Sequence, residues 1–172
     1  WRPAAVSQKP VLGVPTGPYL EKASAVGRNH LERVIEQLRS ADFQVIEVPA
    51  MPDYPEIVER HNRVLAAEAA EAHRGWFSEF EPLYHPKTAE LIRRGQAVGP
   101  SDLAAARAGG KVLRAELSRL MEQDGLDLWL SPSAVGPAPE GLESTGDPAM
   151  NLAWTHAGLP TLTLPTGRST NG

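Results

Sequence analysis

The chain has 172 residues, a length that fits one domain or a large part of one. Hydrophobic residues make up 41% and charged residues 22%, which is an ordinary globular composition. The net charge of -4, without a cluster of Lys or Arg, argues against a nucleic-acid-binding surface. We therefore expect no nucleic-acid partner.

The absence of cysteine and of a long apolar run narrows the possible classes of protein further. The lack of cysteine excludes a disulfide framework, a cysteine-based metal site and a cysteine nucleophile, and it fits a cytoplasmic protein. No apolar run approaches the roughly 18 residues of a membrane span, and the first residues lack the hydrophobic segment of a signal peptide. The chain begins with Trp1 rather than Met, so we expect a fragment, a processed product or the ordered part of a longer protein.

The first third of the chain predicts a strand, a helix and a second strand. Residues 11–14 form a short apolar run that a Pro- and Gly-containing turn closes at residues 15–18. Apolar residues at helical spacing predict a helix over about 24–39. Residues 43–48 are dense in β-forming residues and precede Pro49. This order is typical of a βαβ unit, in which the two strands are parallel.

A long helical block follows. Asp53 with Glu56 three residues later resembles a capping box, and it predicts a helix to about Arg74. Residues 76–84 are aromatic and acidic, and a further helix is predicted over about 86–97. The block from about 53 to 97 should form a covering layer or subdomain.

The next helix is the clearest in the chain. Ser101 is a favourable N-cap residue, an apolar stripe follows it, and Gly125 should end the helix. Residues 126–130 then predict a strand of alternating leucines. A loop rich in Pro, Gly and Ser follows over residues 131–145.

The last elements are a short helix and a final strand. Asp147 should cap the helix with Pro148 at its first position, and Gly158 should end it. Residues 159–164 predict the last strand. The whole pattern predicts an α/β fold: a mixed, largely parallel sheet with helices packed around it, forming one structural unit over residues 1–172.

A serine triad is the first candidate for catalysis. Ser133, Asp147 and His156 follow the chain order of α/β-hydrolases, but the Gly-x-Ser-x-Gly elbow is absent. Capping already explains Asp147. His156 falls in the last helical turn, where the helix dipole favours a partly cationic side chain. The structural interpretation is therefore preferred, and no catalytic residue is assigned.

Metal and phosphate sites are also disfavoured. Glycines precede Lys111 as in a P-loop, but Ala105 and Val112 replace the residues that the motif requires. Several metal-ligating residue types gather in the helical block without the spacing of a zinc helix, so a solvated helix face is preferred. These residues are His61, Glu68, Glu71, His73, Glu81 and His85. We expect no metal and no cofactor.

A binding site is expected at the loop of residues 131–145, because ligands of open α/β sheets bind at the carboxyl ends of the strands. The polar or aromatic residues nearest this loop in the sequence are Ser131, Ser133, Trp154 and Thr155, which we predict to bind substrate. The alternative, in which Trp154 is a core aromatic and the serines are turn residues, stays open.

The chain resembles the C-terminal part of the amidase signature family over nearly its whole length. No single matching segment is highly specific, but their order and spacing are. Upstream, the matching segments are Val11-Leu12-Gly13-Val14-Pro15 and Val45-Ile46-Glu47-Val48-Pro49. Downstream they are residues 126–130 with Ser131-Pro132, Ala138-Pro139, Thr145-Gly146-Asp147-Pro148, the helix with Asn151, Ala157-Gly158-Leu159-Pro160 and Leu164-Pro165-Thr166-Gly167.

The resemblance implies a hydrolase of carbon–nitrogen amide bonds. Members of the family use a Ser–cis-Ser–Lys triad, whose serines lie in a Gly/Ser-rich stretch before the region that matches here. This sequence contains no such stretch. The chain would then be a C-terminal portion that supplies sheet, helices and pocket wall and is inactive alone. Its partners would be a small-molecule amide and the rest of the amidase chain.

Two other functions stay open. The chain could be a catalytically silent binding or scaffold module of the same fold. It could also be part of an amidotransferase subunit that delivers ammonia to a partner enzyme. The sequence does not define an oligomeric state, and a homo-oligomer is open as well.

Overall fold

One parallel sheet organises the fold. The computed structural model describes residues 9–167, and in it β1 (Leu12–Thr16) lies between β2 (Val45–Pro49) and β3 (Leu128–Trp129). Leu12 is paired with a residue of β2 on one side and with Leu128 on the other. The predicted βαβ unit with parallel strands is therefore confirmed, and the chain has an α/β fold.

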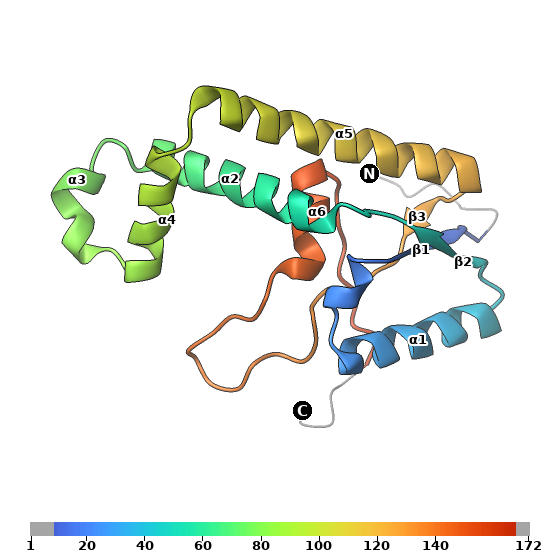
Figure 1. Cartoon of the computed structure of the whole chain (residues 1–172). Helices are drawn as coiled ribbons and strands as arrows, with labels where there is room; N and C mark the ends of the chain where they lie inside the picture. The colour runs from blue at the N-terminus through green and yellow to red at the C-terminus, as the bar shows by residue number, and fades with distance from the viewer. Residues whose placement is uncertain (1–8, 168–172) are drawn as a thin grey trace, which may run out of the picture.

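Helix α1 (Ala25–Ser40) covers one face of this sheet (Figure 1). Its N-cap is Ser24, whose Oγ accepts a hydrogen bond from the Gly27 N–H at 3.1 Å. The buried face of α1 packs on β1 and β2 because both surfaces are apolar. This cluster consists of Leu12, Val14, Leu31, Ile35 and Val45.

The larger core lies on the other side of the sheet. It is shared by α2 (Tyr54–Ala72), the long α5 (Pro100–Asp124) and α6 (Ala149–Ala157), with the short η1 (Leu20–Lys22) at its edge. Figure 1 shows α5 and α2 running alongside each other, with α6 crossing beneath them. Small residues allow these close approaches, since Gly110 of α5 lies against the main-chain oxygen of His156 in α6.

The remaining helices lie at the far end of α2, away from the sheet (Figure 1). They are α3 (Phe77–Phe80), η2 (Glu81–Leu83) and α4 (Pro86–Gln96). Helix α4 packs on α2 through a small core of Ala70, Phe77, Ala89 and Ile92. The helical block predicted for residues 53–97 thus consists of α2, α3, η2 and α4.

Both predicted glycine stops are confirmed. Gly125 ends α5 with φ +63° and Gly158 ends α6 with φ +64°, which is the left-handed conformation that glycine adopts at low cost. These positive φ angles let the chain leave each helix within one residue.

The predicted N-caps fare less well. Helix α5 begins two residues earlier than a Ser101 N-cap would place it, and its N-cap is Gly99. Asp53 is the N-cap of α2 by position, but its carboxylate pairs with Arg60 at 2.7 Å instead of capping the helix. Asp147 does accept the Ala149 N–H at 2.9 Å, although Pro148 occupies the N-cap and not the first helical position.

The predicted strand at residues 159–164 is wrong. The chain leaves α6 without joining the sheet within residues 9–167, and the side chains of Leu162 and Leu164 are 83% and 65% exposed. A strand needs a neighbour to satisfy its backbone hydrogen bonds. β3, which pairs with β1 over two residues only, is the edge strand on that side of the sheet.

Candidate functional site

The Tyr19 hydroxyl lies at the centre of a buried polar cluster between the sheet and α6. It accepts a hydrogen bond from Trp154 Nε1 at 2.9 Å and donates one to the Met150 main-chain oxygen at 2.9 Å. The two rings meet edge to face, with their centroids 5.7 Å apart. The cluster therefore connects Tyr19, which follows the turn after β1, with Trp154 of α6, 135 positions later in the chain.

Tyr54 of α2 extends this cluster. Its hydroxyl donates to the Ala149 main-chain oxygen at 2.7 Å, and its ring lies 5.6 Å from that of Tyr19. Two tyrosines thus hold the first turn of α6 through its carbonyl oxygens. Because these hydroxyls reach across from distant elements, they fix the position of α6 at the end of the loop that precedes it.

Both tyrosines remain protonated at neutral pH. Burial raises the pKa of Tyr19, and hydrogen bonds from Ser131 and Trp154 only partly oppose this. Burial, with smaller contributions from Tyr19 and Asp147, raises the pKa of Tyr54 to about 12. Neither hydroxyl therefore acts as a general base near pH 7, and their chemistry in this cluster is hydrogen-bond donation and acceptance.

The four residues predicted to bind substrate fall into two pairs. Trp154 is only 4% exposed and donates to the Tyr19 hydroxyl, and Ser131 is half-buried and close enough to Tyr19 to affect its pKa. Ser133 and Thr155 are exposed, and Asn151 connects them. The Asn151 side-chain amide donates to the Ser133 main-chain oxygen at 2.8 Å, and the Asn151 main-chain oxygen accepts from Thr155 Oγ1 at 3.0 Å.

Sequence reasoning missed Tyr19, Tyr54 and Asn151. Asn151 had been noted only as part of the family resemblance. The signal for Tyr19 was its place directly after the turn that follows β1, at the carboxyl end of the central strand. Nothing in the sequence signals the contact of Tyr54 with α6, since it joins residues 95 positions apart.

The structure does not assemble a triad from Ser133, Asp147 and His156. The Asp147 carboxylate accepts the Ala149 N–H, while the His156 ring packs against His61 of α2. Burial lowers the pKa of His156, and His61 and Arg60 lower it further. The expectation of a partly cationic His156 is therefore wrong, because desolvation outweighs the helix dipole.

The residues that could have suggested a metal site are engaged elsewhere. His73 Nδ1 and the Tyr84 hydroxyl lie 2.7 Å apart, and Trp76 Nε1 donates to the same hydroxyl at 2.7 Å. Glu68 pairs with Arg107 at 2.9 Å. Within residues 9–167 no group of three His, Asp or Glu side chains has the arrangement of a metal site.

The surface hollows lie away from the four predicted residues. An open hollow of about 460 Å³ is lined by Ser118, Met121, Glu122, Gly125, Leu126 and Asp127. Another of about 510 Å³ lies over the C-terminal half of α1. Both are shallow, and neither includes a residue of the Tyr19 cluster.

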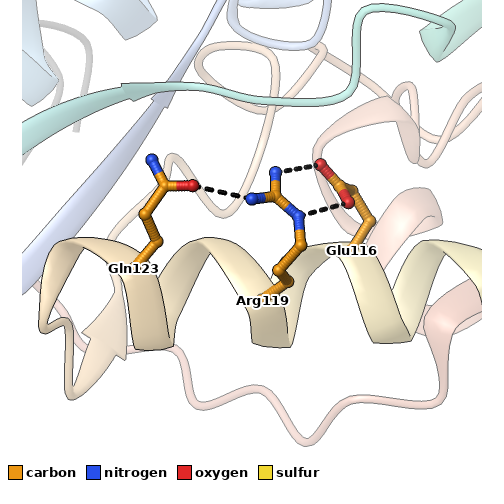
Figure 2. Close-up of polar contacts among 3 residues, drawn as sticks. All are labelled: Glu116, Arg119 and Gln123. Atoms are coloured by element: carbon orange, nitrogen blue, oxygen red, sulfur yellow. Dashed lines mark hydrogen bonds and ion pairs between the residues drawn. The ribbon is translucent and has the colours of Figure 1, made fainter.

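Helix α5 carries a polar network (Figure 2), whose residues are close in the sequence to those that line the first hollow. Arg119 donates to both carboxylate oxygens of Glu116, at 2.9 and 2.7 Å, and to Gln123 Oε1 at 2.6 Å. These hydrogen bonds lower the pKa of Glu116. All three residues are on the exposed face of one helix, so the network is a solvated surface feature rather than a binding site.

The fold of this chain is similar to the folds of solved structures. The crystal structure of an amidase matches 94% of the chain with a TM-score of 0.78 and 27% sequence identity. Two structures, one of them bound to inhibitor, come from a vestigial protein complex that reveals the evolutionary origins of an s-triazine catabolic enzyme. Each matches 87% of the chain with a TM-score of 0.62 and 17% identity.

The chain spans 40% of the length of that amidase and 34% of the other two solved chains. No family model matches the sequence, and no curated protein matches it either. Within residues 9–167, no helix is both long and apolar enough to cross a membrane.

The match to the solved amidase shows that the chain has the α/β fold of part of an amidase.

Proposed function

We propose that this chain is the C-terminal portion of an amidase domain that hydrolyses a carbon–nitrogen amide bond to an acid and ammonia or an amine. One observation carries the proposal: 94% of the chain superposes on 40% of a solved amidase, at 27% identity. The catalytic serine lies outside residues 1–172. The chain itself supplies the parallel sheet, the helices around it and part of the pocket wall.

The proposed chemistry is nucleophilic. A serine hydroxyl attacks the amide carbonyl, the amine leaves, and water releases the acid from the acyl-enzyme. Main-chain N–H groups stabilise the oxyanion. The serines at the loop of residues 131–145 do not suit the role of nucleophile, because no basic side chain is hydrogen-bonded to Ser131 or Ser133 among the described residues.

The pocket wall is proposed to include Ser131, Ser133, Trp154 and Thr155. Ser133 and Thr155 are exposed and would contact the small-molecule amide directly. Ser131 and Trp154 would hold this wall in position through Tyr19. A site of this kind combines exposed polar groups with a rigid apolar support.

Hydrolysis of a panel of amides tests the proposal. The 172-residue chain alone should release no ammonia or amine above the buffer rate. The product of the complete reading frame should hydrolyse at least one amide, and Ser133→Ala and Thr155→Ala should raise its KM. The exposed Ser118→Ala, on α5, is a matched control that should leave KM unchanged.

The outcomes separate the alternatives. Hydrolysis by the 172 residues alone would contradict the proposal. A complete product that binds amides without hydrolysing them would indicate a silent binding module. Ammonia release that requires a co-purifying partner enzyme would indicate an amidotransferase subunit.

A further inference from the structure

Two histidine rings from different helices meet at the edge of the contact between α2 and α6. His61 of α2 and His156 of α6 lie edge to face, with ring centroids 5.9 Å apart and an interplanar angle of 84°. Both side chains are partly buried. They belong to helices that contribute to the same core, so the distance between these rings depends on how α6 sits against α2.

The third wall of this contact is α5, and it leaves little room. A methyl group at Gly110 would lie 2.5 Å from the His156 main-chain oxygen and 3.5 Å from its ring carbon Cε1. The Nε2 atom of His156 is buried without a hydrogen-bond partner, and so is Nε of Arg60 on α2. An N–H at Nε2 of His156 would therefore be buried in a tight space with no acceptor among the described residues.

The charges around the pair also disfavour a proton. On α2, Arg60 faces His156, and Glu68, the one nearby acid that acts on His61, is already paired with Arg107 of α5. Arg60 is itself paired with Asp53 at 2.7 Å. At the end of α6, Arg114 of α5 donates to the Gly158 main-chain oxygen at 3.1 Å. The charge of Arg60 is therefore partly balanced by Asp53, while Glu68 is shared with Arg107.

We propose that His61 and His156 form a proton-sensitive joint, at which acidification between about pH 7 and 5 separates α6 from α2 and α5. Burial lowers the pKa of both histidines in the folded chain. The unfolded chain therefore binds more protons as the pH falls through the ordinary histidine range near 6.5. The stability contributed by the neutral pair is present above that range and is lost below it.

Denaturation by urea across pH 5 to 8 tests the proposal in the 172-residue chain. Each histidine should raise the unfolding equilibrium constant by up to about tenfold per pH unit below its ordinary pKa. The double variant His61→Gln/His156→Gln should lose most of this dependence. His85→Asn, which removes an exposed histidine and retains a helix-capping side chain, should follow the wild-type curve.

If the double variant keeps the wild-type pH dependence, or if His85→Asn removes it equally well, the proposal is overturned. Two measurements on the wild type do not depend on any variant. The ring protons of His61 and His156 should titrate below pH 6.5 by NMR, and titration at or above 6.5 contradicts the joint. Acid should speed amide exchange in α6 before α1, which packs on the opposite face of the sheet; equal acceleration contradicts it.

Discussion

At the scale of single residues, the Tyr19 hydroxyl does the most to order the candidate site. It is both donor and acceptor in a buried environment, so its loss removes two hydrogen bonds and leaves Trp154 Nε1 without its partner. Trp154, which we predicted to bind substrate, is buried and donates its Nε1 proton to this hydroxyl. Together with Tyr54, Tyr19 holds the first turn of α6 without carrying reactive chemistry.

Tyr19→Phe should lower the free energy of unfolding by about 1–3 kcal/mol, because Trp154 Nε1 and the Met150 oxygen lose a buried partner. Tyr54→Phe is the matched control, since it removes a single donor to Ala149 and should cost about 1 kcal/mol. Urea denaturation of both variants measures the difference. Equal losses would show that the Trp154 hydrogen bond contributes nothing.

The sequence predicts residue roles well where the cause is local. Gly125 and Gly158 end helices because their own φ angles are positive, and that tendency is legible in the sequence. The protonation of His156 was predicted wrongly because its pKa is lowered by burial, and further by His61 and Arg60, all of which arise only in the fold. Neighbours brought in by packing outweigh the helix position.

At the scale of elements, the helices of the larger core are held close by glycines. Gly109 and Gly110 are consecutive in α5, yet they face different neighbours. Gly109 lies against the flexible side chain of Arg60, and Gly110 against the main chain of His156. A flexible side chain can move aside, whereas main chain in a packed helix cannot do so cheaply.

Gly110→Ala should therefore destabilise the chain by about 1–3 kcal/mol, even though Ala favours an exposed helix by about 1 kcal/mol. Gly109→Ala should be neutral or stabilising, because only Arg60 must move. Thermal denaturation of the pair compares the two sites within one helix. A stabilised Gly110→Ala variant would contradict the close approach of α5 and α6.

The order of the elements was predicted correctly, except that the strand predicted at residues 159–164 does not form in the structure. Residues 159–164 have the composition of a strand, and composition records the face that a segment can bury rather than whether a neighbour is present. In the described residues the segment stays outside the sheet. The predicted N-cap positions were also imprecise, because Gly99 and Pro148 occupy the N-caps of α5 and α6, for which polar side chains were expected.

The exposure of this segment predicts a contrast between two leucines. Leu162→Asn should change the free energy of unfolding of the chain by no more than about 0.5 kcal/mol, since the side chain is 83% exposed. Leu117→Ala, in the core at 0% exposed, should cost about 2–5 kcal/mol. Chemical denaturation compares them. A large cost at Leu162 would show that residues 159–164 pack in the isolated chain.

At the scale of the whole molecule, the sheet, its covering helices and the loop of residues 131–145 form a recognisable part of an amidase fold. In the sequence, the resemblance of the quoted segments to the amidase signature family led to that expectation, and the amidase structure supports an amidase-like fold over 94% of the chain. The sequence could not show the cluster around Tyr19, because Trp154 and Tyr19 meet only after folding. The proton-sensitive joint belongs to this scale too, since three helices build it.

The central claim is that catalysis depends on a serine outside residues 1–172. The most direct measurement is to treat the product of the complete reading frame with a serine-reactive fluorophosphonate and to map the modified residue by mass spectrometry. The account predicts one modified serine outside residues 1–172, with hydrolysis lost in proportion to labelling. Modification of Ser131 or Ser133 with the same loss of activity would contradict it.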